Sequence, residues 1–330
     1  MTFYIESRNT DPTYNLALEQ VLFDRMGRED KCFMLWQNHN SIIIGKHQNT
    51  LEEIDAAFVK EQEITVARRL SGGGAVYHDM GNLNFTFITP LENKQGLDFG
   101  FFCEPVQKAL VSFGVPVEIS GRNDMTVEGK KFSGNAQYIK NNKIMHHGTI
   151  LYDSNLEMVG KALKAKDKVE SKAIKSTQSR VTNIRPYMKN DMSTNDFWAA
   201  LKNFLLPVFG MNEIAVDAKD HRAALELREK VYSQWNWNYG NSPPHTLRKT
   251  RRFENCGKID IFLDVERQGV IKNISFYGDY FASRDSCELE KLLTGHHLEY
   301  NEIQALLADT EISQFFYGLD TDRFMALLFE

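Results

Sequence analysis

The chain has 330 residues, of which 42% are hydrophobic and 25% charged, a composition typical of a globular protein large enough for two cores. Its formal net charge of −5 gives no reason to propose nucleic acid as a main partner, because phosphate binding favours a basic surface. No apolar run approaches the ~18 residues of a membrane span and the N-terminus lacks a signal-peptide pattern. We therefore expect a cytoplasmic protein with no membrane partner.

The first half of the chain alternates helical and strand patterns. They predict, in order, a helix from Pro12 to 26, strands on both sides of a polar turn at 37–40, a helix over 54–62, strands over 64–70 and 81–90, a helix over 104–113, and strands around 115–119 and over 124–134, 135–148 and 149–153. In the strand over 81–90, apolar Leu83, Phe85 and Phe87 alternate with polar side chains, which predicts a half-buried strand.

The second half predicts more helix and a change of domain. A lysine-rich stretch over 156–180 is followed by a helix capped at Ser193 or Thr194, a helix over 221–240, a helix-breaking "NSPP" at 241–244, a hairpin over 258–280 and two or three short helices. We expect a domain over 1–240 with a mixed sheet and flanking helices, a linker over 241–252, and a small α+β domain over 253–330. The fold class is α+β.

The stretch "ARRLSGGGAVYHDMGN", residues 67–82, places three consecutive glycines in predicted sheet. Glycine serves where backbone approaches a ligand closely or adopts positive φ. A Walker A loop is excluded because no lysine follows the glycines, and a dinucleotide fingerprint is excluded because Tyr77 stands at its third glycine position. The segment is therefore predicted to be a ligand loop of another kind.

Polar clusters surround this loop in the larger domain: Arg68-Arg69 with Ser71, His78-Asp79, "GRND" at 121–124, "GKKFSGNA" at 129–136 and "HHGT" at 146–149. Taken singly, each has a plain interpretation as surface charge, structural histidine or turn. Together, glycine N–H groups, guanidinium groups and a lysine suit phosphate oxygens, and an aspartate can hold Mg²⁺. No Ser-His-Asp order or Cys-His arrangement is evident, so nucleophilic catalysis is the weaker inference. The set suggests activation of a carboxylate by a nucleotide.

These motifs resemble the lipoate-protein ligases. "RRLSGGGAVYHDMGN" is similar to the lipoate-loop signature, "GRND" and "GKKFSGNA" to the metal and catalytic-lysine segments, and "HHGTIL", "SRVTNIR" and "WNWNYG" follow in the family's order. Leu70 is one mild departure, since a polar residue is common there. The resemblance implies the biotin/lipoate ligase catalytic fold, a mixed sheet with helices related to class II aminoacyl-tRNA synthetases, with a small α+β C-terminal domain.

The chemistry that the resemblance implies has two steps, formation of lipoyl-AMP from lipoate and Mg-ATP, and transfer to a lysine of a lipoyl domain. It implies Lys131 as the catalytic residue, with Lys130 on the opposite strand face, and Asp124 as the Mg²⁺ ligand. It implies ATP binding by Arg69, Gly74, Ala75, Val76, Tyr77 and Lys131, and lipoate binding by Ser71, Gly72, Gly73, Gly74, His78, His147 and Lys131. The implied acceptors are lipoyl domains of 2-oxoacid dehydrogenase complexes or the glycine cleavage H protein, and the lysine-rich stretch matches an adenylate-binding loop.

Two other functions stay open on the sequence. An octanoyl- or lipoyl-transferase would work without ATP through a cysteine nucleophile, but Cys103 lies at an apolar helix start with no histidine or glycine motif around it. A non-catalytic binder of lipoyl-AMP would be expected to lack Lys131, which is present. The preference between lipoate and octanoate is not predicted.

Overall fold

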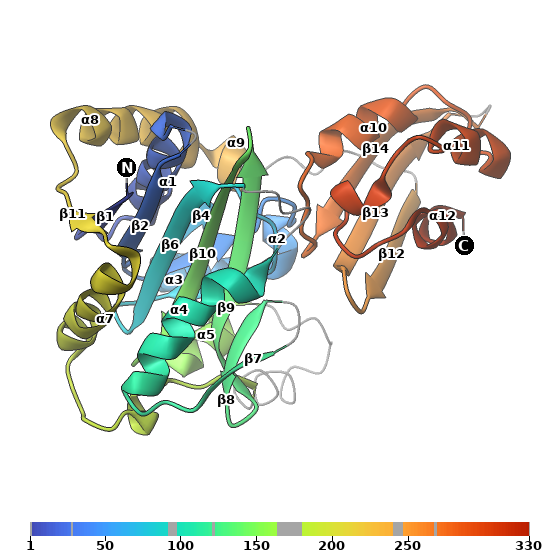
Figure 1. The fold of residues 1–330 in the computed structure, drawn as a ribbon. Coiled ribbons are helices and arrows are strands. Elements are labelled where there is room, and N and C mark those ends of the chain that lie inside the picture. The colour runs from blue at the N-terminus through green and yellow to red at the C-terminus, as the bar shows by residue number, and fades with distance from the viewer. Residues whose placement is uncertain are drawn as a thin grey trace.

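The computed structural model describes residues 2–27, 29–91, 98–120, 123–163, 180–239, 247–266 and 269–329. Figure 1 shows a larger body on the left, built from the first part of the chain, and a smaller body on the right that contains the C-terminus. Within the described residues, no helix has both the length and the apolar character needed to cross a membrane.

An eight-stranded mixed sheet forms the centre of the larger body (Figure 1). In spatial order its strands are β11 (Asn212–Glu213), β1 (Thr2–Ser7), β2 (Lys31–Trp36), β6 (Asn82–Pro90), β10 (Lys143–Leu151), β9 (Lys130–Lys140), β8 (Asp124–Val127) and β7 (Val117–Ser120). Strand β1 pairs in parallel with β11 and β2, and the other pairs are antiparallel. A separate small sheet has the order β4 (Thr65–Arg68), β3 (Ser41–Ile44), β5 (Val76–His78).

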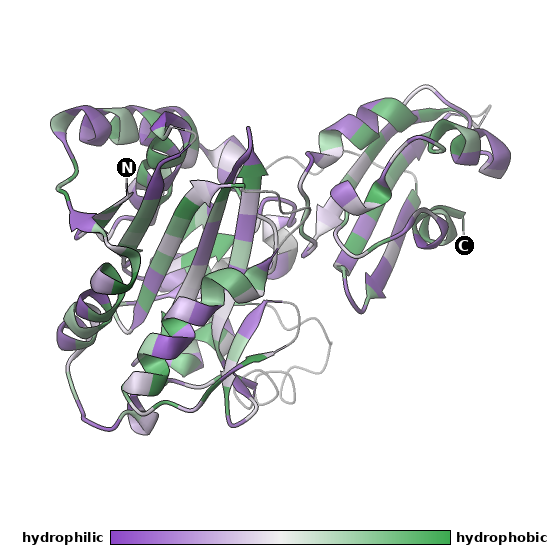
Figure 2. Cartoon of the chain, viewed as in Figure 1, coloured by the Kyte–Doolittle hydropathy of each residue, from purple (hydrophilic) through white to green (hydrophobic). Residues whose placement is uncertain are grey.

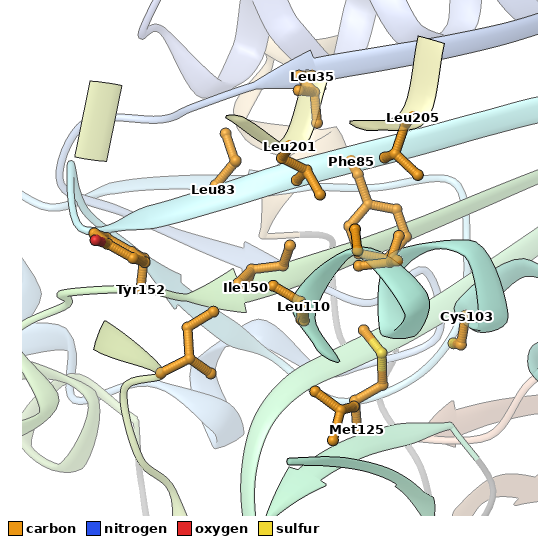
Figure 3. Packing of buried hydrophobic residues seen from close by; sticks show 14 of the residues in the cluster. Leu35, Leu83, Phe85, Cys103, Leu110, Met125, Ile150, Tyr152, Leu201 and Leu205 are labelled. Atoms are coloured by element: carbon orange, nitrogen blue, oxygen red, sulfur yellow. The ribbon is translucent and has the colours of Figure 1, made fainter. Parts of the chain in front are cut away.

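The larger body has helices on both faces of the large sheet and around the small sheet. They are α1 (Pro12–Arg25), α2 (Thr50–Glu53), α3 (Ala56–Glu61), α4 (Phe99–Ser112), α5 (Leu156–Ala162), α7 (Thr194–Phe209), α8 (Ala218–Leu227) and α9 (Trp235–Asn238), with a 3-10 turn η1 (Arg185–Tyr187) and a π-helical turn η2 (Arg228–Tyr232). Helices α4 and α7 bury one face of the sheet in an apolar core, part of which Figure 3 shows. Helices α1 and α8 pack with the opposite face. In Figure 2, α4 carries both hydrophobic and hydrophilic residues around its turns, as expected of a helix with one buried side.

The smaller body is an antiparallel sheet with helices on it. Its elements are β12 (Leu247–Phe253), β13 (Gly257–Val265), β14 (Ile271–Gly278), α10 (Ser286–Leu293), α11 (Tyr300–Leu306), η3 (Ile312–Gln314) and α12 (Thr321–Phe329). The predicted hairpin is confirmed as β13 and β14. Residues 247–252, which we expected in the linker, instead form most of β12, because that stretch pairs with β13 along its whole length.

Several predicted elements differ in their bounds. The three strands expected over 124–153 have other boundaries, because two-residue turns at Glu128-Gly129 and Asn141-Asn142 separate β8, β9 and β10. All four turn residues have positive φ, the geometry of tight antiparallel hairpins. Helix α4 begins upstream of its predicted start because Asp98 caps it, accepting from the N–H of Phe101. The helix expected over 221–240 is broken by η2 and ends before 240.

Strand β6 corrects the sequence analysis most directly. Its polar residues Asn82, Asn84 and Thr86 were expected to face solvent, but each is at most 1% exposed. The opposite face of β6 packs under α4 and α7, and the polar face is covered as well. A buried row of amides and hydroxyls inside a sheet needs partners, and it lies at the candidate site.

Candidate active site

A cavity lies against the covered polar face of the large sheet, bounded by α1, the glycine loop and strands β6, β9 and β10. Predicted site residues line it: Arg69, Gly73, Gly74, Ala75, Val76, His78, Lys131 and His147. A larger cavity of about 510 Å³ lies elsewhere, by α4 and the end of α7, and none of the predicted site residues lines it. The chemistry therefore selects the first cavity.

The glycine loop, residues 70–75, is held by Arg69. The Arg69 guanidinium donates to the carbonyl oxygens of Ile43, Gly72 and Gly74 at 3.0, 2.7 and 2.8 Å, and to Ser71 Oγ at 3.1 Å. Burial lowers its pKa to about 10, so the group stays charged at neutral pH. Arg69 thus shapes the loop backbone while its side chain forms part of the cavity wall.

Arg68 does not serve the site as the arginine pair suggested. Its guanidinium donates to the carbonyl oxygens of Gly45, Gln48 and Trp237 at 2.8, 2.7 and 2.9 Å, and it does not line the cavity. Its role is to join the small sheet to α9.

Two neighbouring residues of this loop, Gly73 and Gly74, are glycine for different structural reasons. Gly73 has φ +88°, and a Cβ there would lie 2.9 Å from the Phe281 ring. Gly74 has no atom within 4 Å of its ideal Cβ position, and it lines the cavity. Gly73 is therefore needed for the fold of the loop, whereas Gly74 leaves bare backbone facing open space.

The smaller body contacts the same loop. The N–H of Gly73 donates to the carbonyl oxygen of Tyr280 at 3.2 Å, and the N–H of Gly278 donates to that of His47 at 2.6 Å. The rings of His47 and Tyr280 stack with their centroids 4.5 Å apart. Gly72, expected to bind lipoate, lies outside the cavity, where its ideal Cβ would be 2.2 Å from the Tyr280 oxygen.

Lys131 and Asp124 face each other on adjacent strands. Lys131 Nζ lies 2.7 Å from Asp124 Oδ1, and each side chain keeps about a third of its surface exposed, 37% and 33%. Lys130, on the other face of β9, is exposed.

The chain just beyond the lysine-rich stretch returns beside Lys131, because the carbonyl oxygen of Lys131 accepts from the N–H of Thr182 at 2.9 Å. Residues 164–179 of that stretch lie outside the described residues.

Ser71, His147 and Glu19 form a buried hydrogen-bond relay. Ser71 Oγ donates to His147 Nε2 at 2.6 Å, and His147 Nδ1 donates to Glu19 Oε1 at 2.9 Å. This Ser-His-Glu order was not evident in the sequence, because Glu19 is 128 residues from His147. Ser71 is 1% exposed and does not line the cavity, so the relay positions the loop and is not a nucleophilic triad.

The chain matches the family model of the lipoyl protein ligase A/B catalytic domain over residues 11–206 and that of the bacterial lipoate protein ligase C-terminus over residues 242–328. It is 40% identical to lipoate-protein ligase LplJ of Bacillus subtilis, with 99% of each chain covered. It is 36% identical to lipoate–protein ligase 1 of Staphylococcus aureus, with 99% of this chain and 100% of that protein covered. The chain belongs to the lipoate-protein ligase family.

Solved structures agree with this assignment. The ligase resembles Plasmodium falciparum LipL1 in complex with lipoate, with a TM-score of 0.81 over 99% of this chain and 97% of that one, at 24% identity. It resembles a bipartite lipoate protein ligase from Thermoplasma acidophilum, described with its E2 lipoyl domain, with a TM-score of 0.64 over 74% and 99%, at 26% identity. For a lipoate-protein ligase A bound with ATP the TM-score is 0.60 over 72% and 98%, at 25% identity. The expected family, fold class and type of enzyme are thereby confirmed.

The ligase site contains residues to which the sequence analysis gave no role. Trp36 and Asn84, outside the polar clusters that it selected, line the cavity, as do Asn123 of "GRND" and Thr149 of "HHGT". The signal for Asn84 was present as the polar half of the β6 alternation, which we assigned to solvent. Tyr77, expected at the nucleotide, points its ring into a separate apolar cluster, and its hydroxyl donates to Asn40 Oδ1 at 3.0 Å.

The residues of the ligase fit the Mg²⁺ that the family implies. Within the described part of the chain, no group of three or more His, Cys, Asp or Glu side chains could hold a metal alone. Mg²⁺ at nucleotide sites typically takes one or two carboxylates and completes its shell with phosphate oxygens and water. Asp124 would supply one such carboxylate, and its buried Oδ1 has no hydrogen bond besides the ion pair with Lys131.

Proposed function

We propose that this ligase joins lipoate to ATP at Lys131 and then transfers the lipoyl group to a lysine of a lipoyl domain. The observation that carries the proposal is Lys131, which lines the same cavity as the bare backbone at Gly74 and whose Nζ lies 2.7 Å from Asp124 Oδ1. An ammonium group and a metal-binding carboxylate at one point suit a reaction that develops charge on phosphate and carboxylate oxygens.

In the first step, a lipoate carboxylate oxygen bonds to the α-phosphorus of ATP and the bond to pyrophosphate breaks. Lys131 holds the carboxylate and α-phosphate oxygens together, and its charge stabilises them most in the transition state. Asp124 would hold Mg²⁺, which would supply neutralisation of phosphate charge. Backbone of the loop from Gly74 to Tyr77 contacts the nucleotide, and His78 and His147 line the acyl pocket.

In the second step, the amine of the acceptor lysine attacks the lipoyl carbonyl and AMP leaves with the bonding electron pair. No enzyme nucleophile is needed. Cys103, which a transferase mechanism would require, lies on the buried side of α4 and is 1% exposed (Figure 3), and burial raises the pKa of its thiol to about 12. A thiol in that state is a poor nucleophile at neutral pH.

The proposed acceptors are lipoyl domains of 2-oxoacid dehydrogenase complexes or the glycine cleavage H protein, and the proposed location is the cytoplasm. Support for the acceptor class comes from the Thermoplasma ligase, which is described with its E2 lipoyl domain. We also propose that residues 1–240 act as the catalytic domain and that the smaller body, from the start of β12 at Leu247 onward, acts as an accessory domain. The two family matches, over 11–206 and 242–328, support this division.

Intact-mass analysis of an apo lipoyl domain tests the function. The domain is incubated with the ligase, Mg²⁺ and lipoate, with and without ATP. The proposal expects a lipoyl mass gain that requires ATP. A gain without ATP from an acylated carrier protein would instead establish a transferase, and lipoyl-AMP binding with no mass gain would establish a non-catalytic binder.

A further inference from the structure

Two buried hydrogen-bond donors face the active-site cavity without an acceptor. His78 Nε2 and Asn84 Nδ2 have no hydrogen-bond partner within the described residues, and their side chains are 2% and 1% exposed. Both residues line the cavity. Because buried polar atoms in folded proteins are nearly always paired, two such atoms in one cavity point to a ligand that pairs with them.

The hydrogen-bond network determines that His78 presents a donor. Asn15 Nδ2 donates to two backbone carbonyl oxygens, at 2.7 and 2.9 Å, and also to Asn38 Oδ1 at 3.0 Å. The other end of that amide, Asn38 Nδ2, therefore donates to His78 Nδ1, 3.1 Å away. A neutral imidazole that accepts at Nδ1 carries its proton on Nε2. Burial, with Arg69 and His147 nearby, lowers the His78 pKa to about 3 and keeps the ring neutral.

Asn84 presents its amide nitrogen to the cavity as a donor. Its Oδ1 accepts from Asn82 Nδ2 at 2.9 Å. The amide nitrogen is left for the cavity, where it has two N–H bonds to donate.

Strand register places Asn84 far from Lys131 across the sheet. A row of neighbouring residues crosses the sheet from β8 to β2. Asp124 on β8 pairs with Gly134 on β9, whose N–H donates to the Thr149 hydroxyl on β10 at 3.1 Å. Thr149 pairs with Asn84 on β6, and Asn84 pairs with Trp36 on β2. Lys131 Nζ lies 3.0 Å from the ideal Cβ position of Gly134 on β9, and two strand spacings of about 4.8 Å separate Gly134 from Asn84, a distance of roughly 10 Å. Asn84 is thus at the Trp36 end of the row, with Asp124 at the other.

His78 lies at the same end as Asn84, because its ring meets the Trp36 ring edge-on at 6.2 Å between centroids. A carboxylate held by Lys131 lies about 3 Å from Nζ, and an extended eight-carbon chain adds about 9 Å from its first to its last carbon. The far end of such an acid therefore reaches Trp36, His78 and Asn84. Octanoate would place a methyl group against two N–H donors, whereas lipoate would place there two ring sulfurs, which are weak acceptors and pack well on aromatic rings.

We propose that His78 and Asn84 recognise the dithiolane sulfurs and make this enzyme selective for lipoate over octanoate. The proposal rests on the proposed function, since it assigns the far end of the acyl pocket to a ligand activated at Lys131. It does not concern the transfer step, and so can be tested without an acceptor protein.

The first test uses the wild-type enzyme and three acids: lipoate, octanoate and 5-cyclopentylpentanoate, which keeps the ring size and replaces both sulfurs by methylenes. Pyrophosphate release gives kcat/KM for each acid. Loss of two weak hydrogen bonds should lower kcat/KM about 10-fold for the carbocyclic acid relative to lipoate. Equal values for these two acids would overturn the proposal. Absence of release with all three would instead overturn the proposed function.

The second test uses Asn84→Leu, which removes the donor at similar side-chain volume. The ratio of kcat/KM for lipoate to that for the carbocyclic acid should fall several-fold. Gln137→Leu is the matched control, since Gln137 is a buried amide of the same sheet that does not line the cavity, and it should leave the ratio unchanged. An unchanged ratio in folded Asn84→Leu would contradict the proposal, and if that variant does not fold, the wild-type comparison decides.

Discussion

The N–H of Gly73 donates to the carbonyl oxygen of Tyr280 at 3.2 Å, so a residue of the smaller body closes a hydrogen bond with the glycine loop. The next residue, Phe281, is fully buried and packs by Gly73 and the Phe99 ring. An ion pair between Lys46 Nζ and Asp285 Oδ2, 2.9 Å long, adds a contact near the same place. The smaller body therefore supports the shape of the active-site loop.

Phe281→Ala tests this support. Removing a buried phenyl ring typically costs about 3–5 kcal/mol of stability, and here it should also weaken lipoate and ATP binding, because the ring packs against Gly73. Phe324→Ala is the matched control, since Phe324 is equally buried but lies within the core of the smaller body. Thermal unfolding and calorimetric binding are the measurements. Equal loss of binding in both variants would show that the ring has no specific role at the loop.

Gly73→Val and Gly74→Val should separate folding from binding. At Gly73 a Cβ meets the Phe281 ring at 2.9 Å and the backbone has φ +88°, so we expect a loss of about 1–3 kcal/mol in stability. At Gly74 the side chain would enter open cavity space, so the melting temperature should change little while lipoate or ATP affinity falls. If Gly74→Val melts far below wild type and its folded fraction binds normally, the Gly74 assignment is wrong.

Two buried histidines should make the enzyme less stable in mild acid. Burial lowers the pKa of His78 to about 3 and that of His146 well below its usual range. Below the unfolded value of about 6.5, the unfolded chain binds protons that the folded chain does not, so stability falls as pH decreases from 6.5 toward 3. The slope is up to about 1.4 kcal/mol per pH unit for each histidine.

Urea unfolding at pH 7 and pH 5 measures this dependence. His146→Gln should reduce the difference in unfolding free energy between the two pH values, and His297→Gln, at an exposed position, should leave it unchanged. A His146→Gln variant with the wild-type pH dependence would exclude His146 as a source of the slope.

Features that depend on local pattern could be predicted from the sequence. Helix α1 follows from Pro12 and its apolar spacing, and α7 from its Ser193 cap, which accepts from the N–H of Asp196. The Lys131 assignment came through resemblance to a family, and its distance from Asp124 agrees with it.

Features that depend on contacts distant in sequence could not be predicted. The Ser71–His147–Glu19 relay joins residues 76 and 128 positions apart, from the loop, a strand and a helix. The alternation of apolar and polar residues in β6 is the same whether the polar face of the strand is exposed to solvent or lines a covered cavity. Only the position of α1 and the glycine loop over that face distinguishes the two.

The central claim is that Lys131 carries out lipoate activation, and pyrophosphate release with lipoate and Mg-ATP measures it most directly. Loss of one preorganised electrostatic contact typically lowers turnover about 10²–10³-fold. We predict that loss for Lys131→Ala with little change in substrate affinity, no rescue by Lys131→Arg because a planar guanidinium cannot replace a compact ammonium, and near-wild-type release by Lys130→Ala. Near-normal release by folded Lys131→Ala, or a larger loss in Lys130→Ala, would contradict the account.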